Sequence, residues 1–126
     1  MKILVVDDSP TMRRILIAQL GQLGYGEVEE ADNGQVALER LKSRPFDFVL
    51  TDWNMPFMDG RSMVMELRQT PGIDQLPVVM VTTRNTKADV IEALKAGVNN
   101  YVVKPFKPSD LGKKIDAVLA AGAKTN

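Results

Sequence analysis

Short apolar runs alternate along this chain with stretches in which apolar residues recur at helical spacing. The runs are rich in β-branched residues, and we interpret them as five strands over 3–6, 28–31, 48–51, 78–82 and 101–103. Helical spacing predicts a first helix over 10–23, a last helix through 111–119, and three more that begin near residues 35, 61 and 88. Strands and helices therefore alternate throughout the chain.

This alternation defines the expected fold class. Strands joined by helices form right-handed crossovers, which produce a parallel sheet with helices on both faces. Local signals agree with the boundaries: Ser9-Pro10 is typical of a helix start, and Gly24 and Gly97 are typical of helix ends. The sequence predicts an α/β protein with a five-stranded, doubly wound parallel sheet and five helices.

Length and composition narrow the class of protein. The 126 residues suffice for one domain, which we place at 1–121, with a loose tail at 122–126 and no output domain. The 16 basic residues balance 16 acidic ones, so neither nucleic acid nor a membrane surface is an expected partner. No apolar stretch approaches the roughly 20 residues of a membrane-spanning helix, and the N-terminal run is too short for a signal peptide. We expect a cytoplasmic monomer.

Two missing residue types restrict the metal chemistry. The chain has no cysteine and no histidine, which excludes a thiol nucleophile and effectively excludes zinc. Any bound metal therefore needs oxygen ligands, which favours Mg²⁺, with Mn²⁺ as an alternative.

Polar residues stand at the carboxyl ends of four expected strands. Asp7 and Asp8 follow the first strand, Asp52 follows the third, Thr82 closes the fourth, and Lys104 follows the fifth. Each has an ordinary alternative, since carboxylates favour helix starts and loops, threonine is common in strands, and a loop lysine is usually solvated. Because parallel strands bring these ends to one edge, where open sheets bind ligands, we favour a shared site.

Three carboxylates at one edge require cations. At a separation of about 4 Å each pair repels by roughly 4 kcal/mol, even in a surface-like dielectric. Mg²⁺ and Lys104 together would balance the cluster, and both would be needed to hold a phosphoryl group on Asp52. An aspartyl phosphate is a reactive anhydride that hydrolyses, which suits a transient signal. Because the chain lacks histidine, a phosphohistidine donor would be another protein.

Five segments together resemble response-regulator receiver domains, and among these the single-domain chemotaxis regulators. The segments are VVDDS at 5–9, TDWNMP at 51–56, MDG at 58–60, MVT at 80–82 and YVVKPF at 101–106. The resemblance runs from residue 2 to about residue 120. It implies the strand order 2-1-3-4-5.

The resemblance also implies a role for each residue at the edge. The implied Mg²⁺ ligands are Asp7, Asp8, Asp52 and the backbone carbonyl of Asn54. The implied phosphoryl-binding residues are Asp52 as acceptor, with Thr82 and Lys104. The chain would act as a switch that assists its own phosphorylation and dephosphorylation.

A conformational change and a set of partners follow from the same resemblance. Tyr101 would turn inward when Thr82 moves, which would alter the face formed by the fourth helix, fifth strand and fifth helix. The donor would be a histidine kinase, the output partner could be the flagellar motor switch, and a phosphatase could act on the product. The Lys104-Pro105 bond would be cis.

Several residues depart from the chemotaxis pattern. Arg84 and Thr83 replace an acidic and a smaller residue near the pocket mouth, and Phe57 replaces a polar one. The sequence therefore does not predict how long a phosphoryl group would persist on Asp52 or which output partner the chain would bind. Trp53, beside Asp52, is expected to be partly exposed, with burial in the core as the alternative.

Other functions are compatible with this architecture, because a fold does not fix a function. A phosphorelay intermediate or another single-domain regulator would use the same site. An aspartyl-phosphate phosphatase would place its nucleophile and acid two positions apart after the first strand, whereas Asp7 and Asp8 are adjacent. A flavodoxin-like carrier of FMN would have its phosphate repelled by the same pair.

Overall fold

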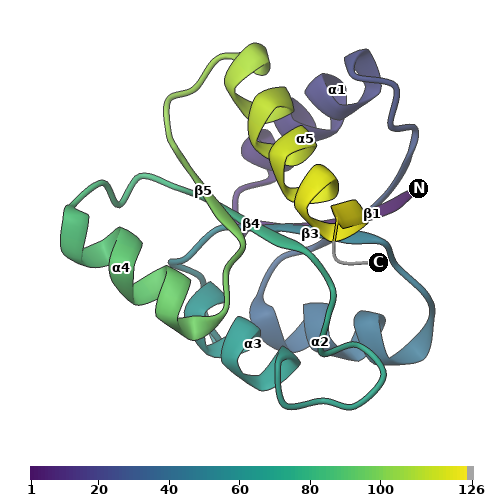
Figure 1. The fold of residues 1–126 in the computed structure, drawn as a ribbon, viewed down its shortest axis with the longest axis vertical. Coiled ribbons are helices and arrows are strands. Elements are labelled where there is room, and N and C mark those ends of the chain that lie inside the picture. Colours follow the sequence, from purple (N-terminus) through teal and green to yellow (C-terminus); the bar gives the residue numbers. More distant parts are fainter. Residues whose placement is uncertain (125–126) are drawn as a thin grey trace.

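The computed structural model describes residues 1–124, in which five strands alternate with five helices (Figure 1). In chain order the elements are β1 Lys2–Val6, α1 Pro10–Gln22, β2 Glu27–Ala31, α2 Gly34–Ser43, β3 Phe48–Thr51, α3 Gly60–Leu67, β4 Val78–Thr82, α4 Lys87–Ala96, β5 Asn100–Val103 and α5 Pro108–Lys124. Every expected strand and helix is present.

All five strands are parallel and lie in the order β2-β1-β3-β4-β5, as the family resemblance implied. The last residue of β1, Val6, pairs with Thr51 at the end of β3. Likewise, Thr82 at the end of β4 pairs with Val103 at the end of β5. The loops that follow these strands therefore begin at the same edge of the sheet.

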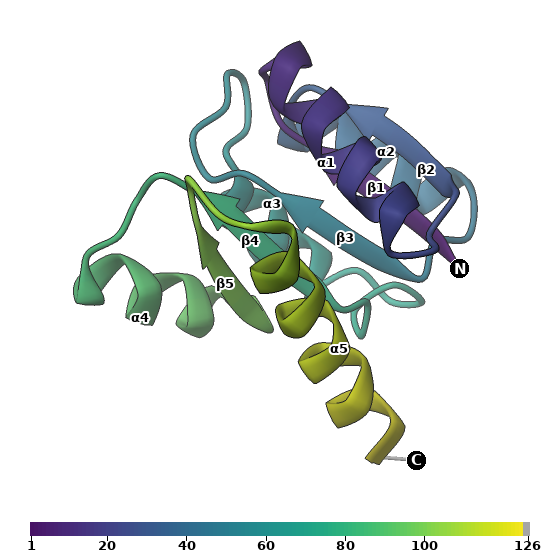
Figure 2. The same ribbon diagram turned by 90° about the horizontal axis from the view of Figure 1, so that it is seen from above.

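Helices cover both faces of the sheet (Figures 1 and 2). Successive strand residues point to opposite faces, so Leu4 and Val6 join the core beneath α2, α3 and α4, whereas Ile3 and Val5 join the core beneath α1 and α5. All four side chains are fully buried. Burial on both faces explains why the strands are continuous apolar runs rather than alternating ones.

Four helices are preceded by a residue whose side chain accepts a hydrogen bond from a backbone amide of the first turn. These capping residues are Ser9 for α1, Asn33 for α2, Asp59 for α3 and Thr86 for α4. At the other end of α4, Gly97 has a φ of 116°, a left-handed conformation that ends the helix as expected. The helices are thus fixed close to the sheet edge that carries the polar residues.

Helix α5 continues to Lys124, so it runs into the segment expected as a tail, and residues 125 and 126 lie outside the described part of the chain. The alanines around Gly122 have the highest helix propensity of any residue, which outweighs a single glycine. Among the helices described, none is long and apolar enough to cross a membrane.

Candidate functional site

Three aspartates meet at the carboxyl edge of the sheet. Asp7 and Asp8 directly follow β1, and Asp52 directly follows the neighbouring strand β3. Each contributes a carboxylate oxygen to a group in which these atoms all lie within 4.8 Å of one another. Asp7 is buried, Asp52 is partly buried and Asp8 is exposed, so the group opens to solvent on one side.

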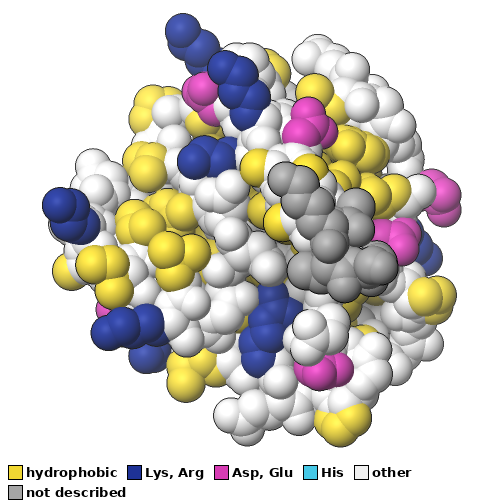
Figure 3. Space-filling model, viewed as in Figure 1, with side chains coloured by type: hydrophobic (Ala, Val, Ile, Leu, Met, Phe, Trp, Pro, Cys, Tyr) yellow, Lys and Arg dark blue, Asp and Glu magenta, His cyan; other side chains and the backbone are white. Residues whose placement is uncertain are grey.

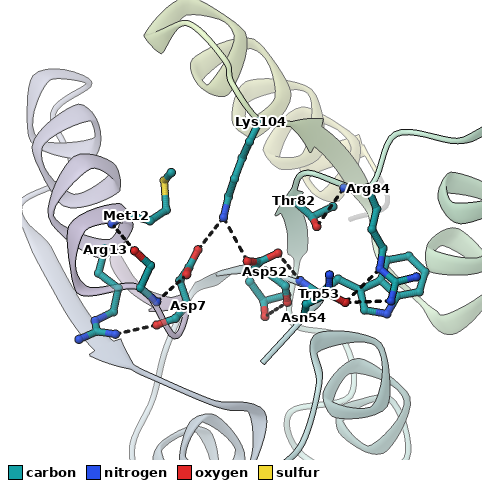
Figure 4. Close-up of polar contacts among 11 residues, drawn as sticks. Asp7, Met12, Arg13, Asp52, Trp53, Asn54, Thr82, Arg84 and Lys104 are labelled. Carbon is teal, nitrogen blue, oxygen red and sulfur yellow. Dashed lines mark hydrogen bonds and ion pairs between the residues drawn. The ribbon is translucent and has the colours of Figure 1, made fainter. Parts of the chain in front are cut away.

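Backbone and side-chain contacts hold Asp7 in place. Its Oδ1 accepts a hydrogen bond from the Ser9 amide at 2.9 Å, and its backbone carbonyl accepts one from the Arg13 guanidinium at 2.7 Å (Figure 4). Ser9 in turn caps α1 through the Met12 amide at 3.2 Å. The start of α1 therefore fixes the orientation of this carboxylate.

The Lys104 side chain lies between two of the aspartates and forms ion pairs with both (Figure 4). Its Nζ donates to Asp7 Oδ2 at 2.8 Å and to Asp52 Oδ2 at 3.1 Å, and its side chain is 11% exposed. Burial by itself would lower the pKa of Lys104, but the hydrogen bond to Asp7 and the charge of Asp52 outweigh it, so the pKa lies above its ordinary value. Lys104 therefore carries a firmly held positive charge.

The backbone around Lys104 points this side chain toward the sheet edge. The Lys104 amide donates to the Thr82 carbonyl at 2.8 Å, which continues the pairing of β4 with β5. The Lys104-Pro105 bond is cis, as the resemblance implied.

Asp52 is constrained through its own backbone. Its amide donates to the Val6 carbonyl at 2.9 Å, and its Oδ1 accepts from the Trp53 amide at 2.6 Å. Gly60, at the start of α3, lies so close that a Cβ atom there would overlap the Asp52 carbonyl oxygen. The loop after Asp52 is therefore packed tightly against it.

The acidic group has the composition of a site for a hard divalent cation. Its donors are carboxylate oxygens, which Mg²⁺ prefers. Three carboxylates and the Lys104 ammonium leave two formal negative charges, which one Mg²⁺ would balance. The residues therefore fit the metal that their chemistry predicts.

Two of the predicted site residues lie beside this group without bonding to it. Thr82 is fully buried at the end of β4, and its Oγ1 accepts from the Arg84 amide at 3.4 Å. Asn54 is exposed, and its Oδ1 accepts two hydrogen bonds from the Arg84 guanidinium at 3.1 and 2.8 Å. The side chains of both residues thus bond to Arg84 rather than to the Lys104 ammonium.

Arg84 also covers Trp53, whose environment differs from the expectation. Trp53 is only 3% exposed and belongs to the core beneath α2, α3 and α4, so the prediction of partial exposure was wrong. The Arg84 guanidinium carbon lies 4.2 Å from the centre of the indole ring, within the range of a cation–π interaction (Figure 4). The unusual residue type at position 84 was visible in the sequence, but this contact was not.

Tyr101 lies under the same loop. It is 7% exposed on β5, and its hydroxyl donates to the Arg84 carbonyl oxygen at 2.8 Å. Burial, together with the negative charge of Asp89, raises the pKa of Tyr101 to about 12. The inward orientation of this ring is already present in the structure.

Alkaline titration should report that inward position. We expect Tyr101 to ionise near pH 12, against an ordinary tyrosine value near 10, and this step in ultraviolet absorbance should vanish in Tyr101→Phe. The unfolded chain would lose this proton from about pH 10, whereas the folded chain retains it, so the wild type should lose stability between about pH 10 and 12. A midpoint near pH 10 in the difference between the wild-type and Tyr101→Phe titrations would contradict the inward position.

Comparisons with known proteins agree with this architecture. The family described as "Response regulator receiver domain" matches residues 3–116. The chemotaxis protein CheY1 of Helicobacter pylori is 52% identical over 120 residues, which cover 94% of this chain and 97% of that protein.

Two solved structures are also similar. The chemotaxis response regulator CheY4 of Vibrio cholerae superposes with a TM-score of 0.85 at 35% identity, over 93% of this chain and 97% of that chain. The receiver domain of the sensor histidine kinase PA1611 from Pseudomonas aeruginosa PAO1 has a TM-score of 0.86 at 29% identity, over 94% and 97% of the two chains. That structure contains a magnesium ion coordinated in its active-site cleft.

Proposed function

This chain belongs to the response regulator receiver family, and from that premise we propose that it is a chemotaxis switch phosphorylated on Asp52. The observation that carries the proposal is the position of Lys104, whose ammonium lies between Asp7 and Asp52 at the one edge where three carboxylates meet. The phosphoryl donor in this proposal is a phosphohistidine of a histidine kinase, and the protein acts in the cytoplasm.

The proposed transfer exchanges one bond to phosphorus for another. A carboxylate oxygen of Asp52 attacks the phosphorus atom, an O–P bond forms, the N–P bond breaks, and its electron pair stays on the histidine nitrogen of the donor. Lys104 is close enough to move from the Asp52 carboxylate to a phosphoryl oxygen, where its positive charge would offset the incoming dianion. Phosphoryl transfer requires mainly positioning and charge neutralisation, which this arrangement supplies.

Magnesium is the expected cofactor, with Mn²⁺ as an alternative. We propose Asp7, Asp8, Asp52 and the backbone carbonyl of Asn54 as its protein ligands, supported by the oxygen cluster and by the magnesium in the PA1611 receiver. When bound, the ion would neutralise charge on the carboxylates and on the phosphoryl oxygens. The hydrogen bond from the Ser9 amide to Asp7 Oδ1 would orient this carboxylate toward the ion.

The proposed switch runs from Thr82 to Tyr101. A new phosphoryl oxygen would attract the Thr82 hydroxyl, which now accepts from the Arg84 amide at 3.4 Å. Arg84 is also the residue whose carbonyl oxygen holds the Tyr101 hydroxyl. A movement of Thr82 would therefore be passed to Tyr101 through one residue of the β4–α4 loop.

The output surface proposed for this switch is the face formed by α4, β5 and α5. A pocket of about 300 Å³ lies beside Tyr101 and is lined by Phe106, Asp110, Lys113 and Lys114 among others. Ile91 and Leu94 on α4 are each 47% exposed, and Figure 3 shows apolar side chains gathered over this helix. We propose the flagellar motor switch as the partner, and the lysines and exposed apolar side chains of this face would suit an apolar contact flanked by acidic residues.

Metal removal tests the proposed site. Phosphorylation by acetyl phosphate should need Mg²⁺ and should stop when EDTA is added. The Asp8→Asn variant should require at least about tenfold more Mg²⁺, because it loses a charged ligand. The fluorescence of Trp53, whose amide donates to Asp52, provides the binding curve.

Asp32→Asn is the matched control, because Asp32 follows β2 at the same edge but is not part of the carboxylate group. Its Mg²⁺ requirement should equal that of the wild type. Labelling of the wild type that persists in EDTA would contradict the proposed metal site.

A further inference from the structure

One apolar side chain near the site is far more exposed than any other of its size. Phe57 is 88% exposed, whereas the other exposed large apolar side chains of the described residues lie between 38% and 47%. It belongs to the loop that joins β3 to α3, five residues after Asp52. An aromatic ring left almost entirely in water is unusual and often marks a contact with a partner.

The exposure of Phe57 is built into the backbone. Its φ is 66°, which makes it the one non-glycine residue with a positive φ among those described. The amide of Met58 donates to the carbonyl of Pro56 at 2.7 Å, so residues 56–58 form a tight γ-turn. Bulky residues avoid this conformation, so the surrounding structure must impose it.

Backbone hydrogen bonds hold both sides of this loop in place. The Gly60 amide donates to the Trp53 carbonyl at 2.8 Å, and the Gly34 amide donates to the Met58 carbonyl at 2.9 Å. A Cβ atom on Gly60 would overlap the Asp52 carbonyl oxygen, and a Cβ atom on Gly34 would lie 2.8 Å from the Met58 carbonyl oxygen. Neither position therefore has room for a side chain. Phe57 is therefore presented from a fixed support, which reduces the entropy cost of binding through it.

The position of this support suggests the partner. The loop begins directly after Asp52, so we expect a protein that brings a phosphorylated side chain to Asp52 to approach it, whereas a small acyl phosphate need not touch it. Residues 53–58 carry no charged side chain, so the loop offers an apolar rather than an ionic contact.

We infer that Phe57 is a docking residue for the protein phosphodonor, and that it inserts into an apolar depression beside the phosphohistidine of that donor. This inference rests on the proposed function. It assigns Phe57 to recognition of the donor, not to the chemistry on Asp52. The loop is continuous with the acceptor site, which favours the donor over an output protein or a second copy of this chain.

The test compares a protein donor with a small one. A ³²P-labelled chemotaxis histidine kinase that phosphorylates the wild type serves as the first donor, and acetyl phosphate with Mg²⁺ serves as the second. Phe57→Asn removes the ring, and asparagine adopts a positive φ more readily than phenylalanine does, so the variant should fold. We expect its KM for the kinase to rise about tenfold or more, because a buried aromatic anchor is typically a binding hot spot. Labelling by acetyl phosphate should stay within about twofold of the wild type.

Two further variants sharpen the comparison. Phe57→Leu keeps an apolar side chain and should retain transfer within about threefold of the wild type. Met65→Gln changes another exposed apolar residue, on α3, and should leave transfer from both donors unchanged.

Equal transfer from the kinase to the wild type and to Phe57→Asn would overturn the inference and leave the residue to another partner. An equal loss with both donors would also overturn it, since the defect would then lie in the acceptor site. Failure of the wild type to accept label from acetyl phosphate would instead overturn the proposed function, and this inference with it.

Discussion

Replacing Asp52 with asparagine is expected to reduce phosphorylation by acetyl phosphate at least about a hundredfold, because loss of a nucleophile typically costs an enzyme far more than that. The amide cannot form an acyl phosphate. Its oxygen can still accept from the Trp53 amide, and Lys104 can still pair with Asp7, so the fold should persist. Incorporation of ³²P into the purified chain measures the effect.

Asp59→Asn is the matched control for this variant. It makes the same chemical change seven positions away, and asparagine can replace aspartate as the cap of α3. Its label should equal that of the wild type. Substantial label on Asp52→Asn would show that another residue accepts the phosphoryl group.

The second large effect concerns Gly60. A Cβ atom at this position would overlap the Asp52 carbonyl oxygen and would come within 3.2 Å of Thr51 Oγ1. Because both obstacles belong to the strand end that carries the acceptor, the loop or the strand must shift. We expect Gly60→Ala to lower the free energy of unfolding by at least about 2 kcal/mol, as overpacking of a tight contact does. Phosphorylation should also slow, because Asp52 would move relative to Lys104.

Urea unfolding of Gly60→Ala is best compared with that of Gly21→Ala. Gly21 lies inside α1, and nothing comes within 4 Å of the Cβ atom that alanine would add. Alanine should therefore raise the free energy of unfolding by roughly 0.5–1 kcal/mol through its higher helix propensity. Equal effects of the two substitutions would contradict the close approach at Asp52.

Much of the fold could be predicted because the same residues carry two independent signals. In β1, the run from Ile3 to Val6 is apolar on both faces and is short, which indicates a strand buried between two layers of helices. Ser9-Pro10 marks the start of α1 by a capping preference that is local to the sequence. Propensity and burial therefore point to the same elements.

The convergence of Asp7, Asp8, Asp52 and Lys104 follows from topology alone, since parallel strands end at one edge. Their contacts do not follow from topology. The environments of Trp53 and Arg84 depend on how a loop after β3 folds back on the core and how a long side chain from another loop covers it. Periodicity carries no information about such loops, which is why the burial of Trp53 was predicted wrongly.

The exposed Phe57 illustrates the same limit. Residue type alone favours burial of phenylalanine, and only the backbone, with its positive φ and its two fastened sides, reveals that the ring points into solvent. Family resemblance identified the position as unusual without indicating its exposure.

The central claim is that Asp52 becomes an aspartyl phosphate, and its most direct test is chemical trapping. Borohydride reduces an acyl phosphate of aspartate to homoserine, which peptide mass spectrometry can locate. After treatment with acetyl phosphate and Mg²⁺, we predict homoserine at residue 52, and none there when EDTA replaces the metal. Homoserine at residue 7 or 8, or a phosphorylated chain without homoserine at 52, would contradict the account.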